Sequence, residues 1–236
     1  IDAEHALNTE YCEQIGIEVN DLYISQPTFG EQAIEAIRAL IETGQVDLII
    51  VDSVAALTPR STLEGESGQA QMAVQARMMS QAMKLITGPA SEHECTVIFI
   101  NQLRATMSMY GPSQTTTGGK ALKFFASQRL EIKNKGKLKV GEEVVGFKQL
   151  IDIVKNKIGS PFKKVQYDIV YGKGIDKVNG LIEGCVKQGI LERNGAYYKY
   201  NGDNIAQGMK KLLVLLDSNP ALLEELEAEY KAKTSK

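Results

Sequence analysis

The sequence predicts an α/β fold built on a mainly parallel β-sheet and followed by a small α+β unit, and three observations support it. Short apolar runs rich in β-branched residues, VDLIIVD at 46–52 and TVIFINQ at 96–102, are typical of strands buried on both faces of a parallel sheet. Segments with helical periodicity separate such runs, as right-handed crossovers require. Polar residues follow each run, at the sheet edge where α/β proteins usually bind ligands.

The first helix is expected to begin near Thr28 and to end at Gly44. Thr28 and Glu31 fit a capping box, in which each side chain bonds the backbone amide of the other residue. Apolar residues then recur at helical spacing from Ile34 to Ile41.

A second helix is expected from about Met72 to Thr87, because Gly88 and Pro89 follow and proline usually ends a helix. Beyond it the pattern changes to three strand-like segments, at 128–133, 149–157 and 163–172. We expect these segments to extend the sheet.

The chain of 236 residues, 43% hydrophobic, has room for one substantial domain and a smaller one. We divide it into a core at 1–174 and a C-terminal domain at 175–236. The smaller domain is expected to contain a helix near 177–188, a hairpin that turns at Asn194–Gly195, and two helices around Asn219–Pro220.

Composition excludes several classes of protein. Cys12, Cys95 and Cys185 are widely spaced and lack a metal-ligand pattern, which favours free thiols in a reducing compartment. His5 and His93 are the only histidines, which argues against a zinc site or a histidine-based triad. No apolar run approaches the length of a membrane span. We therefore expect a cytoplasmic protein with no membrane partner.

Charge is distributed unevenly along the chain. The net charge is -2, but the segment from Arg104 to Lys164 carries thirteen Lys or Arg and four Asp or Glu, a balance of +9. The remaining residues, 14 basic and 25 acidic, carry -11. Two interpretations stand, a face that binds a polyanion and a solvated lysine-rich surface.

Three strand ends are expected to line one site. Ile1 and Asp2 look like the end of a strand, and Glu4 follows them; Asp52 and Ser53 follow the second apolar run, and Asn101 and Gln102 follow the third. Asp52 could hold the Mg²⁺ of a nucleoside triphosphate, directly or through water, and Ser53 could support it. Glu4 could activate a water, and Gln102 could sense the terminal phosphate.

The glycine-rich loop that cradles phosphates, GxxxxGK(S/T), is absent from these residues. Either the chain does not bind nucleotide in this way, or the loop precedes Ile1. The order strand, helix, strand favours the second interpretation, and we therefore expect the sequence to be a fragment.

Two irregular segments are candidates for contact with nucleic acid. In the segment after Gln102, the basic side chains of Arg104, Lys120 and Lys123 could neutralise phosphates. The large side chains of Met107, Met109 and Tyr110 could pack on bases. The backbone at Gly118 and Gly119 could approach a sugar-phosphate chain closely. The segment at 60–72 is a weaker candidate, with Met72 and Arg77 at the start of the next helix.

Seven segments identify a family. DAEHAL, LIIVDSVAALTPR, ARMMSQAMKLITG, VIFINQLR, TTTGGKALKFFAS, VKNKIGSPFK and YGKGI resemble the bacterial RecA recombinase family in order and spacing. The resemblance covers almost the whole chain. It implies a RecA-like P-loop ATPase core with a mainly parallel central sheet, plus a small α+β C-terminal domain.

The resemblance also implies an activity. Such proteins are DNA-dependent ATPases that form helical homo-oligomeric filaments on single-stranded DNA, use ATP and Mg²⁺, and exchange strands with homologous double-stranded DNA. Recombinational DNA repair, a part in the SOS response and contact with an SOS repressor are implied as well. These 236 residues alone, without the phosphate loop, are not expected to hydrolyse ATP.

Individual residues match functional positions of the family. The implied roles are water activation for Glu4, magnesium association for Asp52, coupling of nucleotide to DNA for Gln102, and charge stabilisation at a neighbouring protomer's phosphates for Lys155 and Lys157. The remaining matches are adenine stacking by Tyr11 and Tyr171, a subunit contact at Phe124, and DNA contacts at Met72, Arg77, Lys84, Arg104, Gly118 and Gly119.

Two rival hypotheses belong to other classes. The first is a non-catalytic DNA-binding or regulatory module, if the chain truly starts near Ile1; the sequence upstream would decide. The second is a ring-forming helicase with a similar core, which the DNA-loop segments and VKNK disfavour.

Overall fold

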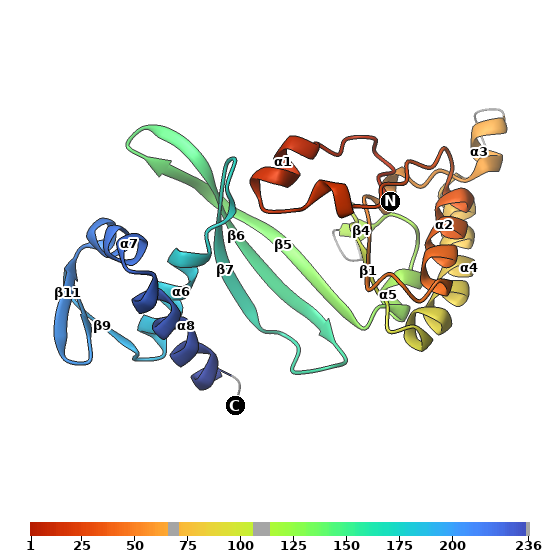
Figure 1. Ribbon diagram of the computed structural model, residues 1–236. Coiled ribbons are helices and arrows are strands. Elements are labelled where there is room, and N and C mark those ends of the chain that lie inside the picture. Colours follow the sequence, from red (N-terminus) through yellow and green to blue (C-terminus); the bar gives the residue numbers. More distant parts are fainter. Residues whose placement is uncertain (66–70, 106–113, 235–236) are drawn as a thin grey trace. The chain divides into compact units, whose positions relative to one another are not determined.

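The computed structural model describes residues 1–65, 71–105 and 114–234. The chain forms two compact units, Ile1–Arg129 and Leu130–Lys236, and each is described by itself (Figure 1). The domain boundary at residue 174 stays a prediction.

The first unit contains a parallel pair of strands. β1 (Leu48–Val51) pairs in register with β2 (Thr96–Phe99), and Asp2 forms a parallel bridge with Asp52. The Asp52 amide donates to the Ile1 carbonyl at 2.9 Å, and the Ala3 amide donates to the Asp52 carbonyl at 2.7 Å. Ile1 and Asp2 therefore lie beside the end of β1 in the parallel direction, through an isolated bridge, and their place at the end of a strand stays a prediction.

Helices cover one face of this sheet. α2 (Gly30–Glu42) and α4 (Gln71–Glu92) lie side by side and pack with the short α5 (Ala121–Phe125) on the core (Figure 1). In β1 the side chains of Ile49 and Val51 are buried, whereas Ile50 is 45% exposed. The prediction of strands buried on both faces was therefore wrong, because the helices described in this unit bury alternate side chains only.

Both predicted helices are present, but their ends differ from the sequence pattern. The prediction of a capping box was wrong. The Thr28 amide donates to Gln32 Oε1 at 2.9 Å, and the Glu31 carboxylate instead accepts the Arg60 amide. α4 continues through Pro89 to Glu92. Proline fits helical φ angles, so Pro89 forfeits an amide donor without ending the helix.

Short elements complete the first unit. They are α1 (Thr9–Gln14), the 3₁₀ turns η1 (Val19–Asp21) and η2 (Val54–Ala56), α3 (Arg60–Glu64), and a hairpin of β3 (Leu103–Ala105) with β4 (Gln114–Thr116). The hairpin forms the root of the basic segment after Gln102.

A second, four-stranded sheet has the order β5 (Gln128–Val140), β6 (Glu143–Asn156), β7 (Lys164–Val170) and β8 (Gly174–Ile175). β7 is antiparallel to both β6 and β8. The prediction that these segments extend the parallel sheet was wrong, since their backbone hydrogen bonds join them to one another in a sheet of their own.

The last sixty residues form a helical and hairpin-rich part with its own core. α6 (Lys177–Lys187), α7 (Met209–Ser218) and α8 (Pro220–Thr234) pack with the antiparallel strands β9 (Leu191–Asn194), β10 (Tyr197–Tyr200) and β11 (Asp203–Gln207). The predicted helix, hairpin and pair of helices are all present.

The three cysteine thiols are buried and free, as predicted. Within the described ranges, no helix combines the length and the apolar character that a membrane crossing needs.

Candidate functional site

Asp2 organises the turn that carries Glu4. Its side chain is 8% exposed and accepts three hydrogen bonds, from the Ala6 and Leu7 amides at 3.2 Å each and from Gln26 Nε2 at 2.9 Å. Burial raises the pKa of Asp2, but these hydrogen bonds outweigh burial and leave the pKa below its ordinary value. Asp2 is therefore an ionised structural residue, and no motif in the sequence indicates this role.

We expect Asp2→Asn to destabilise the protein by about 1–3 kcal/mol, because an amide nitrogen would face donors that a carboxylate satisfies. Urea unfolding of the variant and of Gln26→Ala, which removes one donor, measures this; the smaller loss should belong to Gln26→Ala. Since the folded pKa is lowered, the stabilisation is present above the ordinary carboxyl pKa and is lost as the pH falls through the folded value. A difference between wild type and Asp2→Asn that persists fully in acid would contradict this account.

Glu4 and Asp52–Ser53 come together at neighbouring strand ends. Ser53 is 1% exposed, and its Oγ donates to Glu4 Oε1 at 2.5 Å. The Asp52–Ser53 peptide bond is cis. Burial raises the pKa of Asp52, and the negative charges of Glu4 and Asp2 raise it further. Carboxylates thus gather at one sheet edge and create a negative field that a cation would relieve.

The donor chemistry of this edge fits magnesium. Mg²⁺ prefers carboxylate and other oxygen ligands together with several waters. Asp52 offers an exposed carboxylate beside the negative charges of Glu4 and Asp2, and Ser53 offers a hydroxyl directly after it.

Asn101 ties the basic segment to the end of β2. Its Nδ2 donates to the Thr117 carbonyl at 3.0 Å, and its Oδ1 accepts the Thr117 hydroxyl at 2.5 Å and the Gln102 amide at 2.8 Å. Asn101 thereby holds both ends of the β3–β4 hairpin and orients the backbone of Gln102. The sequence pattern marks Asn101 only as the end of a strand, although an amide side chain there is a signal for such a clamp.

Gly118 and Gly119 lie at the far root of the same segment and pack closely. A Cβ at Gly118 would lie 2.8 Å from Val54 Cγ1, and one at Gly119 would lie 2.7 Å from Ala76 Cβ. Both have φ of +76°, which side chains disfavour. The glycines are thus explained by contact with η2 and α4; their predicted approach to a nucleic acid stays a prediction.

The other predicted DNA contacts occupy different places. Arg104 lies on β3 and is exposed, as are Arg77 and Lys84 on α4, and Met72 is 86% exposed at the start of that helix. Lys120 is exposed and Lys123 is half-buried on α5. Met107, Met109 and Tyr110 lie outside the described residues.

The aromatic candidates lie on three elements. Phe124 lies on α5, and its side chain is 71% exposed. Tyr11 lies on α1, where Asn8 Oδ1 caps the helix by accepting its amide. Tyr171 belongs to the second unit, where its ring meets the Phe147 ring edge to face at 5.5 Å.

Lys155 and Lys157 also belong to the second unit. Lys155 is the half-buried penultimate residue of β6, and Lys157 is exposed in the turn that follows. Between them, Asn156 Oδ1 accepts the Ile158 amide at 3.2 Å and shapes that turn. The structure therefore places two lysines at one end of the β6–β7 hairpin.

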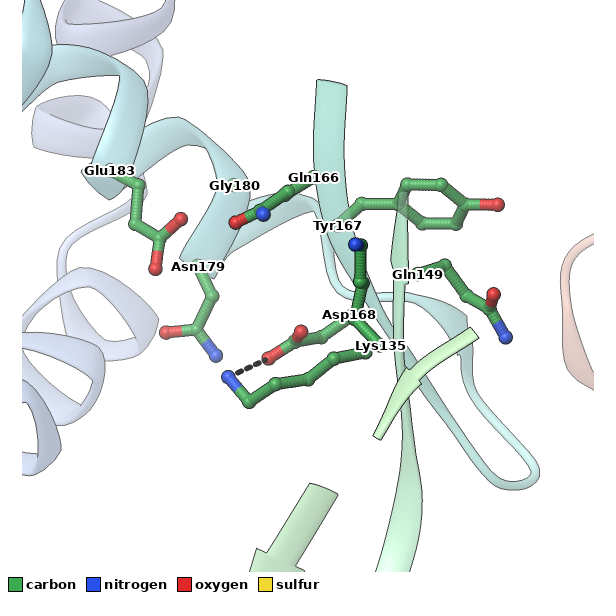
Figure 2. A pocket seen from close by; sticks show the side chains of 9 residues that line it. Lys135, Gln149, Gln166, Tyr167, Asp168, Asn179, Gly180 and Glu183 are labelled. Carbon is green, nitrogen blue, oxygen red and sulfur yellow. Dashed lines mark ion pairs between the residues drawn. The ribbon is translucent and has the colours of Figure 1, made fainter. Parts of the chain in front are cut away.

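A cavity of about 230 Å³ lies elsewhere in the second unit, between the strands and α6. Figure 2 shows Asn179 and Glu183 of α6 facing Asp168 of β7 across it. Asp168 pairs with Lys148 at 3.6 Å, and Asp176 accepts the Asn179 amide at the helix start. None of the site residues named from the sequence lines this cavity.

Comparison with known proteins agrees with the seven-segment resemblance. The model of the RecA N-terminal domain matches residues 1–176, and that of the RecA C-terminal domain matches residues 179–235. Proteins named RecA from Acinetobacter baylyi, Syntrophus aciditrophicus and Chloroherpeton thalassium are 46%, 45% and 47% identical over 97%, 99% and 98% of this chain. The chain spans about two thirds of their lengths, 66%, 68% and 65%. With both domain models matched and a parallel α/β core in place, the chain belongs to the RecA family.

Proposed function

We propose that the complete protein is a DNA-dependent ATPase that pairs and exchanges homologous DNA strands in recombinational repair. It acts as a helical filament on single-stranded DNA and captures double-stranded DNA, in the cytoplasm. The observation that carries the proposal is the clamp of Asn101 on Thr117, because it fixes a basic segment to the strand end next to Glu4 and Asp52. A part in the SOS response, through contact with a repressor, belongs to the same proposal.

In this proposal Glu4 accepts the proton of the water that attacks the terminal phosphate of ATP. The hydrogen bond from Ser53 holds one carboxylate oxygen, which leaves the other oxygen for water. Gln102 contacts the terminal phosphate and reports its presence to the β3–β4 hairpin. Asp52, with Ser53, would hold Mg²⁺ through water, and the ion would neutralise phosphate charge.

Residues of a neighbouring protomer complete the proposed site. Lys155 and Lys157 reach the ATP phosphates that the adjacent protomer binds and stabilise the negative charge that develops there during hydrolysis. Hydrolysis therefore depends on filament assembly. Phe124 packs at the subunit contact, where its exposed ring would be covered. Tyr11 and Tyr171 stack near the adenine.

Arg104→Ala in the complete protein tests the DNA side. We expect single-stranded DNA affinity to fall about tenfold, and the slope of log K against log salt to shrink by about 0.7, because one phosphate contact is lost. ATP affinity should not change. Arg38→Ala is the matched control, since Arg38 is an exposed arginine on α2 that pairs with Glu42. Unchanged filament formation on single strands would argue against the assignment.

Strand exchange between a single strand and a homologous duplex, with ATP consumption measured in the same reaction, tests the whole proposal. A non-catalytic module would bind DNA with no ATP turnover, and a ring helicase would separate strands without pairing them.

A further inference from the structure

Gln75 connects helix α4 to the turn that follows Asp52 and Ser53. Its Nε2 donates to the Val54 carbonyl and to the Leu57 carbonyl, each at 3.0 Å. A primary amide has two protons on nitrogen, so both are used. The two acceptors lie at the start of η2 and at the residue directly after it. Gln75 therefore holds both ends of this turn.

The turn is itself joined to the strand ends. Val54 is fully buried, and its amide donates to the Ile100 carbonyl at 2.9 Å, one residue before Asn101. The Leu57 amide donates to the Val54 carbonyl at 3.3 Å. The Val54 carbonyl oxygen thus accepts two hydrogen bonds, one from the Leu57 amide and one from Gln75 Nε2. A shift of η2 would consequently move Ser53, which bonds to Glu4.

The root of the basic segment meets the same place. Gly118 packs on Val54 and Met79, and Gly119 packs on Ala76, the residue after Gln75. These approaches are so close that a methyl group would collide at either glycine. Three segments, η2, the first turns of α4 and the glycine pair, thus converge around Val54.

Hydrogen bonds weaken steeply when donor and acceptor separate by about 0.5 Å beyond their optimum. Helix α4 therefore cannot slide along η2 without losing two bonds to buried carbonyls, which is costly. Met72 and Arg77 flank Gln75 on this helix, and both are exposed.

We infer that Gln75 is a positioning residue that transmits DNA engagement at α4 and at the Gly118–Gly119 root to Asp52 and Ser53. The inference rests on the proposed function, since it concerns how DNA stimulates ATP hydrolysis. Gln75 touches neither DNA nor nucleotide in this role; it keeps η2 and α4 moving as one body.

The test uses the complete protein with Gln75→Met, which keeps length and helix propensity but removes both donors. Gln81→Ala is the control, because Gln81 is an exposed glutamine on the same helix. ATP hydrolysis is measured with and without poly-dT, alongside poly-dT affinity and thermal unfolding. We expect the ratio of stimulated to unstimulated rate to fall about tenfold, with poly-dT affinity within about twofold of wild type. A merely structural role would lower both rates together.

Gln75→Ala is the second variant, used if Gln75→Met unfolds, since alanine has the highest helix propensity. If either folded variant keeps the stimulation ratio of Gln81→Ala, the inference is overturned while the proposed function stands. If the wild-type protein hydrolyses ATP without any stimulation by poly-dT, the proposed function fails, and the inference fails with it.

Discussion

Glu4→Gln in the complete protein is expected to abolish ATP hydrolysis while ATP and single-stranded DNA still bind. The amide has the shape of the carboxylate and can still accept the Ser53 hydroxyl, so the strand ends should keep their arrangement. It cannot accept a proton from water, and loss of a general base lowers a rate by about 10²–10⁴-fold. Phosphate release on poly-dT and nucleotide binding by fluorescence measure the two halves of the prediction.

Glu10→Gln is the control for this experiment, because Glu10 is an exposed glutamate in the first turn of α1. It should hydrolyse ATP at the wild-type rate. Normal DNA-stimulated turnover by Glu4→Gln would refute the role of Glu4. A loss of ATP binding in the same variant would instead identify Glu4 as a binding residue.

Lys155→Ala and Lys157→Ala are each expected to slow DNA-stimulated hydrolysis by about 10³-fold, the lower end of what an arginine finger contributes. The physical reason is that a cation placed against developing phosphate charge, in a site with little water, has no substitute in solvent. Lys173→Ala, at an exposed lysine just after Tyr171, should have no such effect.

Mixed filaments decide whether these lysines act across the protomer boundary. In an equal mixture of Glu4→Gln and Lys157→Ala protomers, about a quarter of head-to-tail interfaces would combine an intact Glu4 with an intact Lys157. Activity should therefore return to about a quarter of the wild-type rate, although each variant alone is inactive. An inactive mixture that still forms filaments would show that both residues act within one protomer.

Much of the fold follows from local patterns. The runs at 46–52 and 96–102 become β1 and β2, and the predicted C-terminal helices and hairpin are present. These predictions succeed because alternation and helical periodicity are properties of a few neighbouring residues.

The errors concern what lies beside each segment. Thr28 and Glu31 match a capping box, but Glu31 bonds the Arg60 amide instead, 29 residues away. Ile50 lies in an apolar run typical of a strand buried on both faces, yet its side chain is 45% exposed. The sequences of β5 to β8 predict strands, but no local pattern indicates whether these strands join the β1–β2 sheet or form a sheet of their own.

Polar residues directly after apolar runs mark the sheet edge where α/β proteins usually bind ligands, so candidate site residues at the strand ends can be predicted from the sequence. Glu4, Asp52 and Gln102 could be named on that ground and on the family resemblance. The residues that hold them could not. Asp2, Gln75 and Asn101 act through bonds to Gln26, to Val54 and Leu57, and to Thr117, across 16 to 24 residues of chain.

Periodicity and residue chemistry therefore determine which elements form and which side chains stand at their ends. The tertiary structure alone decides which buried amide meets which carbonyl, because that pairing depends on how distant segments pack. The side-chain amide of Gln75 has the same chemistry whether it faces solvent or packs inside the protein. It can hold the turn at Val54–Leu57 only because the fold places it beside two backbone carbonyl oxygens.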